Sequence, residues 1–282
     1  MDTVGSWHKI VLRAFSSFME NDLTTAAAAV SYFSILVLFP SLLLLLIIGS
    51  NLLGAHEFER EVVDQVLAFL PGAQALIKKN LESISGMSVE VVLSSLLVML
   101  WAGSWLFTVI EKALNRLWGT RPRTFLHGRL VNFAVLSLVW TLLGASALFT
   151  AFASEMRSAA DKMPLKLDPM FVRVSGYAWE AVFITASLVL TVMLFTIMYH
   201  WLPNAKVPWL VSLRGGVIAG VLWEAAKFGF ALLLPYFHYE MLYGSIGAAV
   251  TLLSWVYFSS NIMLFGAQVT ALLHRERLLE NS

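Results

Sequence analysis

The sequence predicts an all-α membrane protein with six transmembrane helices, and its composition and its long apolar runs both point to this fold class. Of the 282 residues, 59% are hydrophobic and 13% are charged, whereas soluble domains average about 45–50% and about 25%. The mean hydropathy is +0.76. Six apolar runs are long enough to cross a bilayer, which takes about 20 residues in a helix. Because the bilayer core offers the backbone no water, these runs must form helices.

The expected spans lie within one polytopic domain, residues 1–282, and cover about 25–53, 89–110, 130–153, 177–201, 210–235 and 244–273. The first span contains Pro40, which removes a backbone hydrogen bond and is therefore a candidate hinge. Loop 54–88 has apolar residues at helical spacing, interrupted at Pro71 and Gly72. It predicts two short amphipathic helices on the outer face.

The N-terminal segment also predicts a short amphipathic helix. Its apolar stripe consists of Trp7, Ile10, Val11, Ala14, Phe15 and Phe18. Such a helix either lies in the cytoplasmic membrane interface or packs on the helix bundle, and the sequence favours neither.

An even number of spans places both termini on the same side of the membrane. The segments on that side hold 11 Lys and Arg residues and the opposite segments hold 7. Because positively charged loops stay in the cytoplasm, we expect both termini to be cytoplasmic.

Two charged residues interrupt the apolar run 210–235. Glu224 and Lys227 are three residues apart, so they share a helix face and can form an ion pair. A charge near the bilayer centre costs about 2.5–3.5 kcal/mol on insertion scales. Gly216 and Gly220 continue the same face as a GxxxG motif, which allows a neighbouring helix to approach closely. The pair is therefore expected to face the bundle interior, either as a functional site or as a structural ion pair.

Mostly polar residues form two further stripes. The second span carries Ser104, Thr108, Glu111 and Asn115 at helical spacing, and the last span carries Gly247, Ser254, Asn261 and Gln268 at steps of seven. Together the stripes suggest a polar cavity open to the cytoplasm, with Glu224, Lys227, Glu111, Asn115 and Asn261 as substrate-binding candidates. The alternative is interhelical hydrogen bonding, worth about 0.6 kcal/mol per contact. For Glu111, a salt bridge with Lys112 or Arg116 is the alternative.

Four arginines follow the second span and would form a rim around such a cavity. They are Arg116, Arg121, Arg123 and Arg129. Guanidinium groups suit anionic headgroups and phosphates, although the same residues also serve to fix the topology.

Three stretches together resemble the YihY/BrkB family of bacterial inner-membrane proteins. They are "LTTAAAAVSYFSILVLFPSLLLL", "IEKALNRLWGTRPRTFLHGRL", and "LPNAKVPWLVSLRGGVIAGVLWEAAKFGF" with the following "YGSIGAAVTLLSWVYFSSNIMLFGAQV". The resemblance covers nearly the whole chain and implies a six-helix protein of the inner membrane. Members of this family often carry a ribonuclease BN label.

The residues themselves argue against ribonuclease or other enzymatic activity. There are no cysteines, the six histidines are scattered, and the net charge of +1 gives no strong attraction to nucleic acid. HExxH, GxxxxGK[ST] and GxSxG motifs are absent. We therefore expect no catalytic residue, metal, cofactor or nucleic-acid partner.

The sequence favours a transporter or translocator of an amphiphile or small solute, such as an anionic lipid. Membrane lipids are the expected partners, and the small-residue faces would permit a homo-oligomer. The alternative is a scaffold that does not transport and instead binds envelope proteins through loop 54–88 and the arginine rim.

Overall fold

The computed structural model describes residues 3–53, 89–121, 123, 128, 130, 134, 169–236 and 247–280. Every regular element in these ranges is helical, as expected for an all-α protein. The elements are α1 (Thr3–Glu20), α2 (Leu23–Leu53), α5 (Val89–Trp118), α7 (Pro169–Trp201), α8 (Trp209–Leu233), the 3₁₀ turn η1 (Leu234–Tyr236) and α10 (Gly247–Glu280). The predicted helices of loop 54–88 and almost all of the predicted span 130–153 lie outside the described residues.

Within the described ranges, three helices are long and apolar enough to cross a membrane. They are Glu90–Trp118, Trp209–Leu233 and Gly247–Leu279, and the bent pair Leu12–Glu20 and Leu23–Leu38 would make a fourth. The apolar part of α7, Thr185–Trp201, is shorter. Helix α5 continues well past the end predicted at residue 110, because its last two turns bury polar residues against other parts of the fold.

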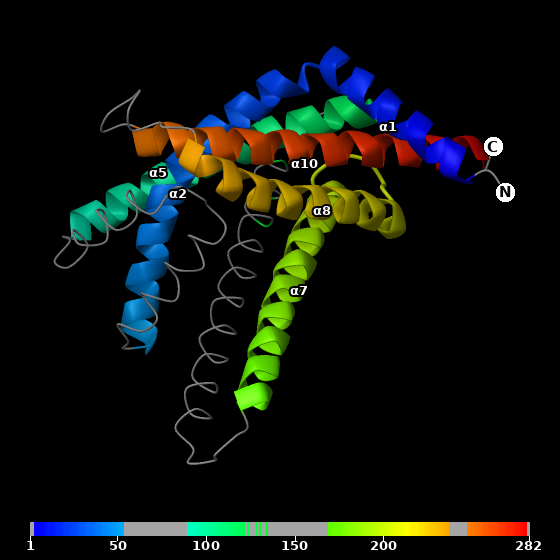
Figure 1. Ribbon diagram of the computed structural model, residues 1–282. Helices are drawn as coiled ribbons and strands as arrows, with labels where there is room; N and C mark the ends of the chain where they lie inside the picture. The colour runs from blue at the N-terminus through cyan, green and yellow to red at the C-terminus, as the bar shows by residue number, and fades with distance from the viewer. Residues whose placement is uncertain are drawn as a thin grey trace.

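Helix α10 is the centre of the arrangement. It contacts α1, α2, α5, α7 and α8, while α2 packs against α5 and α7 against α8. Figure 1 shows α8 and α10 side by side. One hydrophobic core joins the start of α2, the end of α5, the end of α7 and the C-terminal half of α10, through residues such as Leu23, Leu114, Tyr199 and Leu264. These helix ends therefore lie on one side of the fold, as a chain that crosses back and forth requires.

Close contact between α7 and α8 depends on glycine. A Cβ atom added at Gly220 would lie 2.6 Å from Cγ2 of Val192, and one added at Gly216 would collide with the Thr196 hydroxyl. Both partners belong to α7, so the predicted GxxxG face does admit a neighbouring helix. Membrane helices gain little from hydrophobic association and depend on such close packing.

A second small-residue face on α8 packs against α10. A Cβ atom at Gly215 would collide with the side chain of Thr270, and one at Gly266 would lie 2.6 Å from Cβ of Ala219. Helix α8 is therefore packed closely between α7 and α10, with a separate row of small residues for each.

A sharp break separates α1 from α2. The axes of Leu12–Glu20 and Leu23–Leu38 differ by 72°. At the break Asp22 has a positive φ of 52°, a left-handed conformation that Asn and Asp tolerate better than most residues. The Asn21 side chain donates to the Ser17 carbonyl at 2.8 Å, and the Thr25 hydroxyl donates to Oδ1 of Asp22 at 2.7 Å. These local bonds end one helix and begin the next. Further along, α2 continues through Pro40 without interruption, so a hinge there stays a prediction.

Helix α1 packs on the bundle through two residues of its predicted stripe, Ala14 and Phe18. Ala14 and Phe18 are buried, and the Phe18 ring meets that of Phe265 on α10 edge to face, with centroids 6.0 Å apart. Phe15, however, is 60% exposed. The side chains of Trp7, Ile10 and Val11 lie outside the description.

Candidate functional site

The charged pair on α8 forms as the sequence predicts. Nζ of Lys227 lies 2.6 Å from Oε2 of Glu224, and the two side chains are only 15% and 11% exposed. Glu224 is in the middle of α8, about 22 Å from its first residue at 1.5 Å per residue. The pair therefore lies deep in an apolar helix and far from the loops that precede α8.

Helix α7 supplies hydroxyl groups to the same pair. The Ser187 hydroxyl donates to Oε1 of Glu224 at 3.1 Å, and the Thr191 hydroxyl lies 3.5 Å from the same oxygen. Nζ of Lys227 lies 3.5 Å from Oγ of Ser187. Neither α7 residue was predicted, although their spacing of four places both hydroxyls on one face of the helix.

Aromatic rings border the ammonium group. Nζ of Lys227 lies 5.5 Å from the centroid of the Trp223 ring and 5.7 Å from that of Phe228. Both distances allow cation–π attraction. Because rings and helix packing limit access of water, the electrostatic interactions of the pair are stronger than at a solvated surface.

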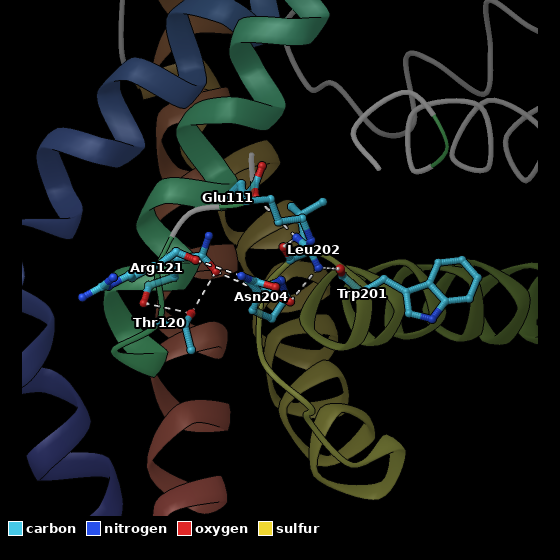
Figure 2. A network of polar contacts seen from close by, with 9 residues as sticks. Glu111, Thr120, Arg121, Trp201, Leu202 and Asn204 are labelled. Atoms are coloured by element: carbon cyan, nitrogen blue, oxygen red, sulfur yellow. Dashed lines mark hydrogen bonds and ion pairs between the residues drawn. The ribbon is translucent and has the colours of Figure 1, made fainter. Parts of the chain in front are cut away.

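A second polar cluster forms where α5 meets the loop between α7 and α8 (Figure 2). The Arg123 guanidinium donates to the carbonyls of Leu202 at 2.6 Å, Trp201 at 3.0 Å and Pro203 at 3.0 Å. It also pairs with Glu111 at 3.4 Å. The last carbonyls of a helix have no partner within that helix, so Arg123 caps the end of α7. Glu111 therefore does form a salt bridge, but with Arg123 and not with the expected Lys112 or Arg116.

Asn115 connects α5 to the same loop. Its Oδ1 accepts hydrogen bonds from the backbone N–H of Asn204 at 2.6 Å and from the Thr120 hydroxyl at 3.1 Å. The Asn204 side chain in turn donates to the Arg121 carbonyl at 3.0 Å. Asn115 is almost fully buried, and its Nδ2 has no hydrogen-bond partner among the described residues. The loop after α7 is thus bound to the end of α5 through both the backbone and the side chain of Asn204.

Arginines at this end of the fold serve other helix ends as well. Nη1 of Arg116 donates to the Asn21 carbonyl at 2.9 Å, and Nη2 of Arg275 donates to the Leu117 carbonyl at 2.8 Å. The Arg121 side chain is exposed, and Arg129 lies outside the described residues. Arg116 and Arg123 therefore have structural roles, and headgroup binding by the arginine rim stays a prediction.

The five predicted binding residues fall in three places. Glu224 and Lys227 face α7, whereas Glu111 and Asn115 hold the end of α5. Nδ2 of Asn261 donates to the Tyr257 carbonyl of its own helix at 2.8 Å. Among the described residues, no group of three or more His, Asp or Glu side chains could hold a metal ion.

The chain resembles known membrane proteins along nearly all of its length. Residues 14–282 match the family described as Virulence factor BrkB. A UPF0761 membrane protein of Alkalilimnicola ehrlichii is 29% identical over 86% of this chain and 53% of its own length. One of Halorhodospira halophila is 27% identical over 92% and 55%, and one of Pseudomonas aeruginosa is 27% identical over 93% and 62%. The chain thus spans a little over half the length of these relatives.

No solved structure matches the chain. The long apolar helices and the family match over residues 14–282 lead to one conclusion. The chain is a polytopic membrane protein and belongs to the BrkB family.

Proposed function

We propose that this protein is a transporter of the bacterial inner membrane that moves an anionic amphiphile or small solute and has no enzymatic activity. In this proposal six segments cross the membrane, and both termini lie in the cytoplasm. The six are α2, α5, the predicted span 130–153, α7, α8 and α10. The bias of Lys and Arg toward the segments on that side supports the orientation. The observation that carries the proposal is the Glu224–Lys227 pair, which the fold buries between α7 and α8.

Stability gives little reason for a pair in this place. Burying two charges costs so much solvation energy that apolar residues of similar size often give an equal or more stable fold. Charged residues inside spans commonly mark the path of a substrate or ion. Binding of a charged ligand would explain why the fold keeps a buried ion pair that adds little to its stability.

The geometry suggests how the pair could exchange partners. Lys227 offers an ammonium group to a phosphate or carboxylate, which would replace Glu224 as its counter-ion. Glu224 would then keep the hydrogen bond from the Ser187 hydroxyl, whereas the Thr191 hydroxyl already donates to the Ser187 carbonyl at 2.9 Å. The Ser187 hydroxyl would thereby lower the cost of separating the pair, because an unpaired buried carboxylate needs donors.

The cytoplasmic end would supply the entrance in this proposal. Arg121 is exposed there and, with Arg129, would attract the anionic group first. Glu111, Asn115, Arg116 and Arg123 would shape the entrance mainly by fixing the helix ends, and Asn261 would line the path beyond them.

The test separates a binding site from a structural ion pair. Glu224→Gln alone removes the carboxylate that pairs with Lys227, and breaking a buried ion pair is expected to cost about 3–5 kcal/mol. The double variant Glu224→Gln/Lys227→Met replaces both charges of the pair by uncharged side chains of similar size and is expected to fold like the wild type. Fluorescently labelled phosphatidylglycerol in proteoliposomes is the transport probe, and protein-free vesicles give the background.

For the double variant we expect translocation to fall by about tenfold or more, equivalent to about 1.4 kcal/mol of barrier. Gly229→Ala, on the same helix with open space around the added Cβ, is the matched control. A folded double variant that translocates as fast as the wild type would show that the pair is structural and would favour the scaffold. Wild-type protein that leaves the background rate unchanged would rule out this lipid class as substrate.

A further inference from the structure

Helix α1 has an apolar face that none of the described helices covers. Leu12 is 71% exposed, Phe15 60% and Met19 55%. Their spacing of three and four residues places them on one side of the helix. Figure 1 shows α1 at the edge of the structure, with its other side toward α10.

Helix α1 also has a buried face against α10 and an exposed polar side. Ala14 and Phe18 are buried against α10, and Arg13, Ser16 and Glu20 are exposed on a polar side. At about 100° per residue, the apolar positions from Ala14 round to Leu12 cover an arc of about 160°. Contact with α10 uses only one half of this arc. The helix is thus more widely apolar than its packing inside the protein requires.

The connection to α2 fixes the direction of α1. Only Asn21 and Asp22 separate the two helices, which are bent by 72°. The Asn21 carbonyl accepts a hydrogen bond from Arg116 of α5, and its amide donates to Gln268 of α10 at 3.4 Å. Helices α5 and α10 therefore both bond to Asn21 at the bend, and these bonds restrain α1 relative to the start of α2.

This bend places α1 near the membrane plane when α2 crosses the bilayer. Spanning helices tilt by about 20° on average, so a helix bent by 72° from one lies at about 50–90° to the membrane normal. An apolar face held at that angle beside a span is in a position to lie against lipid.

We propose that α1 is an interfacial helix whose Leu12, Phe15 and Met19 side chains insert between lipid chains while Ala14 and Phe18 hold it to α10. Its exposed Arg13 lies on the polar side, where it can meet the headgroups of anionic lipids. The two interpretations of the N-terminal segment, interfacial helix and bundle helix, then apply to two faces of the same helix.

Single cysteines test this directly, because the chain has none of its own. Positions 12, 15 and 19 are the test sites, and positions 16 and 20, equally exposed on the polar side, are the matched controls. Each cysteine carries an environment-sensitive fluorophore in full-length protein reconstituted into phosphatidylethanolamine–phosphatidylglycerol vesicles. All five side chains are exposed, so their replacement is expected to disturb the fold little.

We expect iodide in the aqueous phase to quench the fluorophore about threefold less at positions 12, 15 and 19 than at 16 and 20, because an interfacial helix buries its apolar face about 5–10 Å deep. Brominated lipid should quench the fluorophore more strongly at positions 12, 15 and 19 than at positions 16 and 20. Equal quenching at all five positions would overturn the proposal. Iodide protection that disappears when the protein is diluted in lipid would also overturn it and would assign the face to a second copy of the chain.

Discussion

Arg123 gives the sharpest stability prediction, because one side chain holds three parts of the fold together. Its guanidinium donates to the carbonyls of Trp201, Leu202 and Pro203 and pairs with Glu111. The guanidinium is 12% exposed and the carboxylate 8%, so water replaces these interactions poorly. We consider the variant Arg123→Met, which keeps much of the side-chain volume and removes every donor.

The expected loss follows from the number of partners. A hydrogen bond that involves a charged group contributes about 1.5–3 kcal/mol, but the three carbonyls share one guanidinium and their contributions do not add fully. Removing one member of a buried ion pair costs about 3–5 kcal/mol. We therefore expect Arg123→Met to lower the free energy of unfolding by about 3–5 kcal/mol.

Two further variants make the prediction specific. Glu111→Gln leaves Arg123 with all three carbonyls, so its expected cost is smaller, about 1 kcal/mol. Arg123→Lys keeps the charge, but a single ammonium group cannot reach three carbonyls in the fixed geometry of a guanidinium. We expect it to recover less than half of the loss.

Unfolding of purified protein in mixed micelles, followed by tryptophan fluorescence as denaturing detergent is added, measures all three variants. The expected order of stability is wild type, Glu111→Gln, Arg123→Lys and Arg123→Met. An Arg123→Met variant as stable as the wild type, or one no less stable than Glu111→Gln, would refute the capping role.

Two more predictions concern contacts inside the bundle. Gly220→Ala places a Cβ atom 2.6 Å from Cγ2 of Val192 and is expected to cost about 1–3 kcal/mol in the same unfolding assay. Gly229→Ala, with nothing near the added Cβ, is expected to be neutral or stabilising, since alanine is the better helix former; similar losses for the two would contradict glycine-dependent packing. Tyr199→Phe removes a buried hydrogen bond of 2.6 Å to the Met263 carbonyl and is expected to cost about 1 kcal/mol, whereas Tyr32→Phe at an exposed position should cost nothing measurable. Equal melting temperatures for the two tyrosine variants would show that the buried bond contributes nothing.

Local features of the fold could be predicted because they depend on neighbours in the sequence. The apolar run 210–235 gives nearly the observed α8, Trp209–Leu233, and a spacing of three residues is enough to predict that Glu224 and Lys227 pair. The end of α5 was predicted too early, because a count of apolar residues stops at the first charged positions. Glu111 and Asn115 continue the helix there since the fold supplies them with partners.

Long-range partners could not be predicted in the same way. Arg123 caps a helix that ends 78 residues further along the chain, and no local pattern indicates such a contact. The second small-residue face of α8, Gly215 with Ala219, was not predicted, and the sequence alone does not say which helix a small-residue motif meets. Ser187 and Thr191 were missed for a related reason, because isolated hydroxyl residues in a span usually bond to their own helix.

The charged pair and the contacts of Gly216 and Gly220 all lie at the interface between α7 and α8. This shared position bears on how a ligand could reach the pair. Gly220 packs against Val192, next in sequence to Thr191, whose hydroxyl lies near Glu224. A ligand that reaches Lys227 must therefore separate or slide α7 against α8 beside that contact. Interfaces of small residues have few interlocking side chains to oppose sliding, whereas the arginine cap and Asn115 hold the same two helices at their connecting loop. The proposed transport would therefore require α7 and α8 to separate at the pair while their connecting loop stays in place.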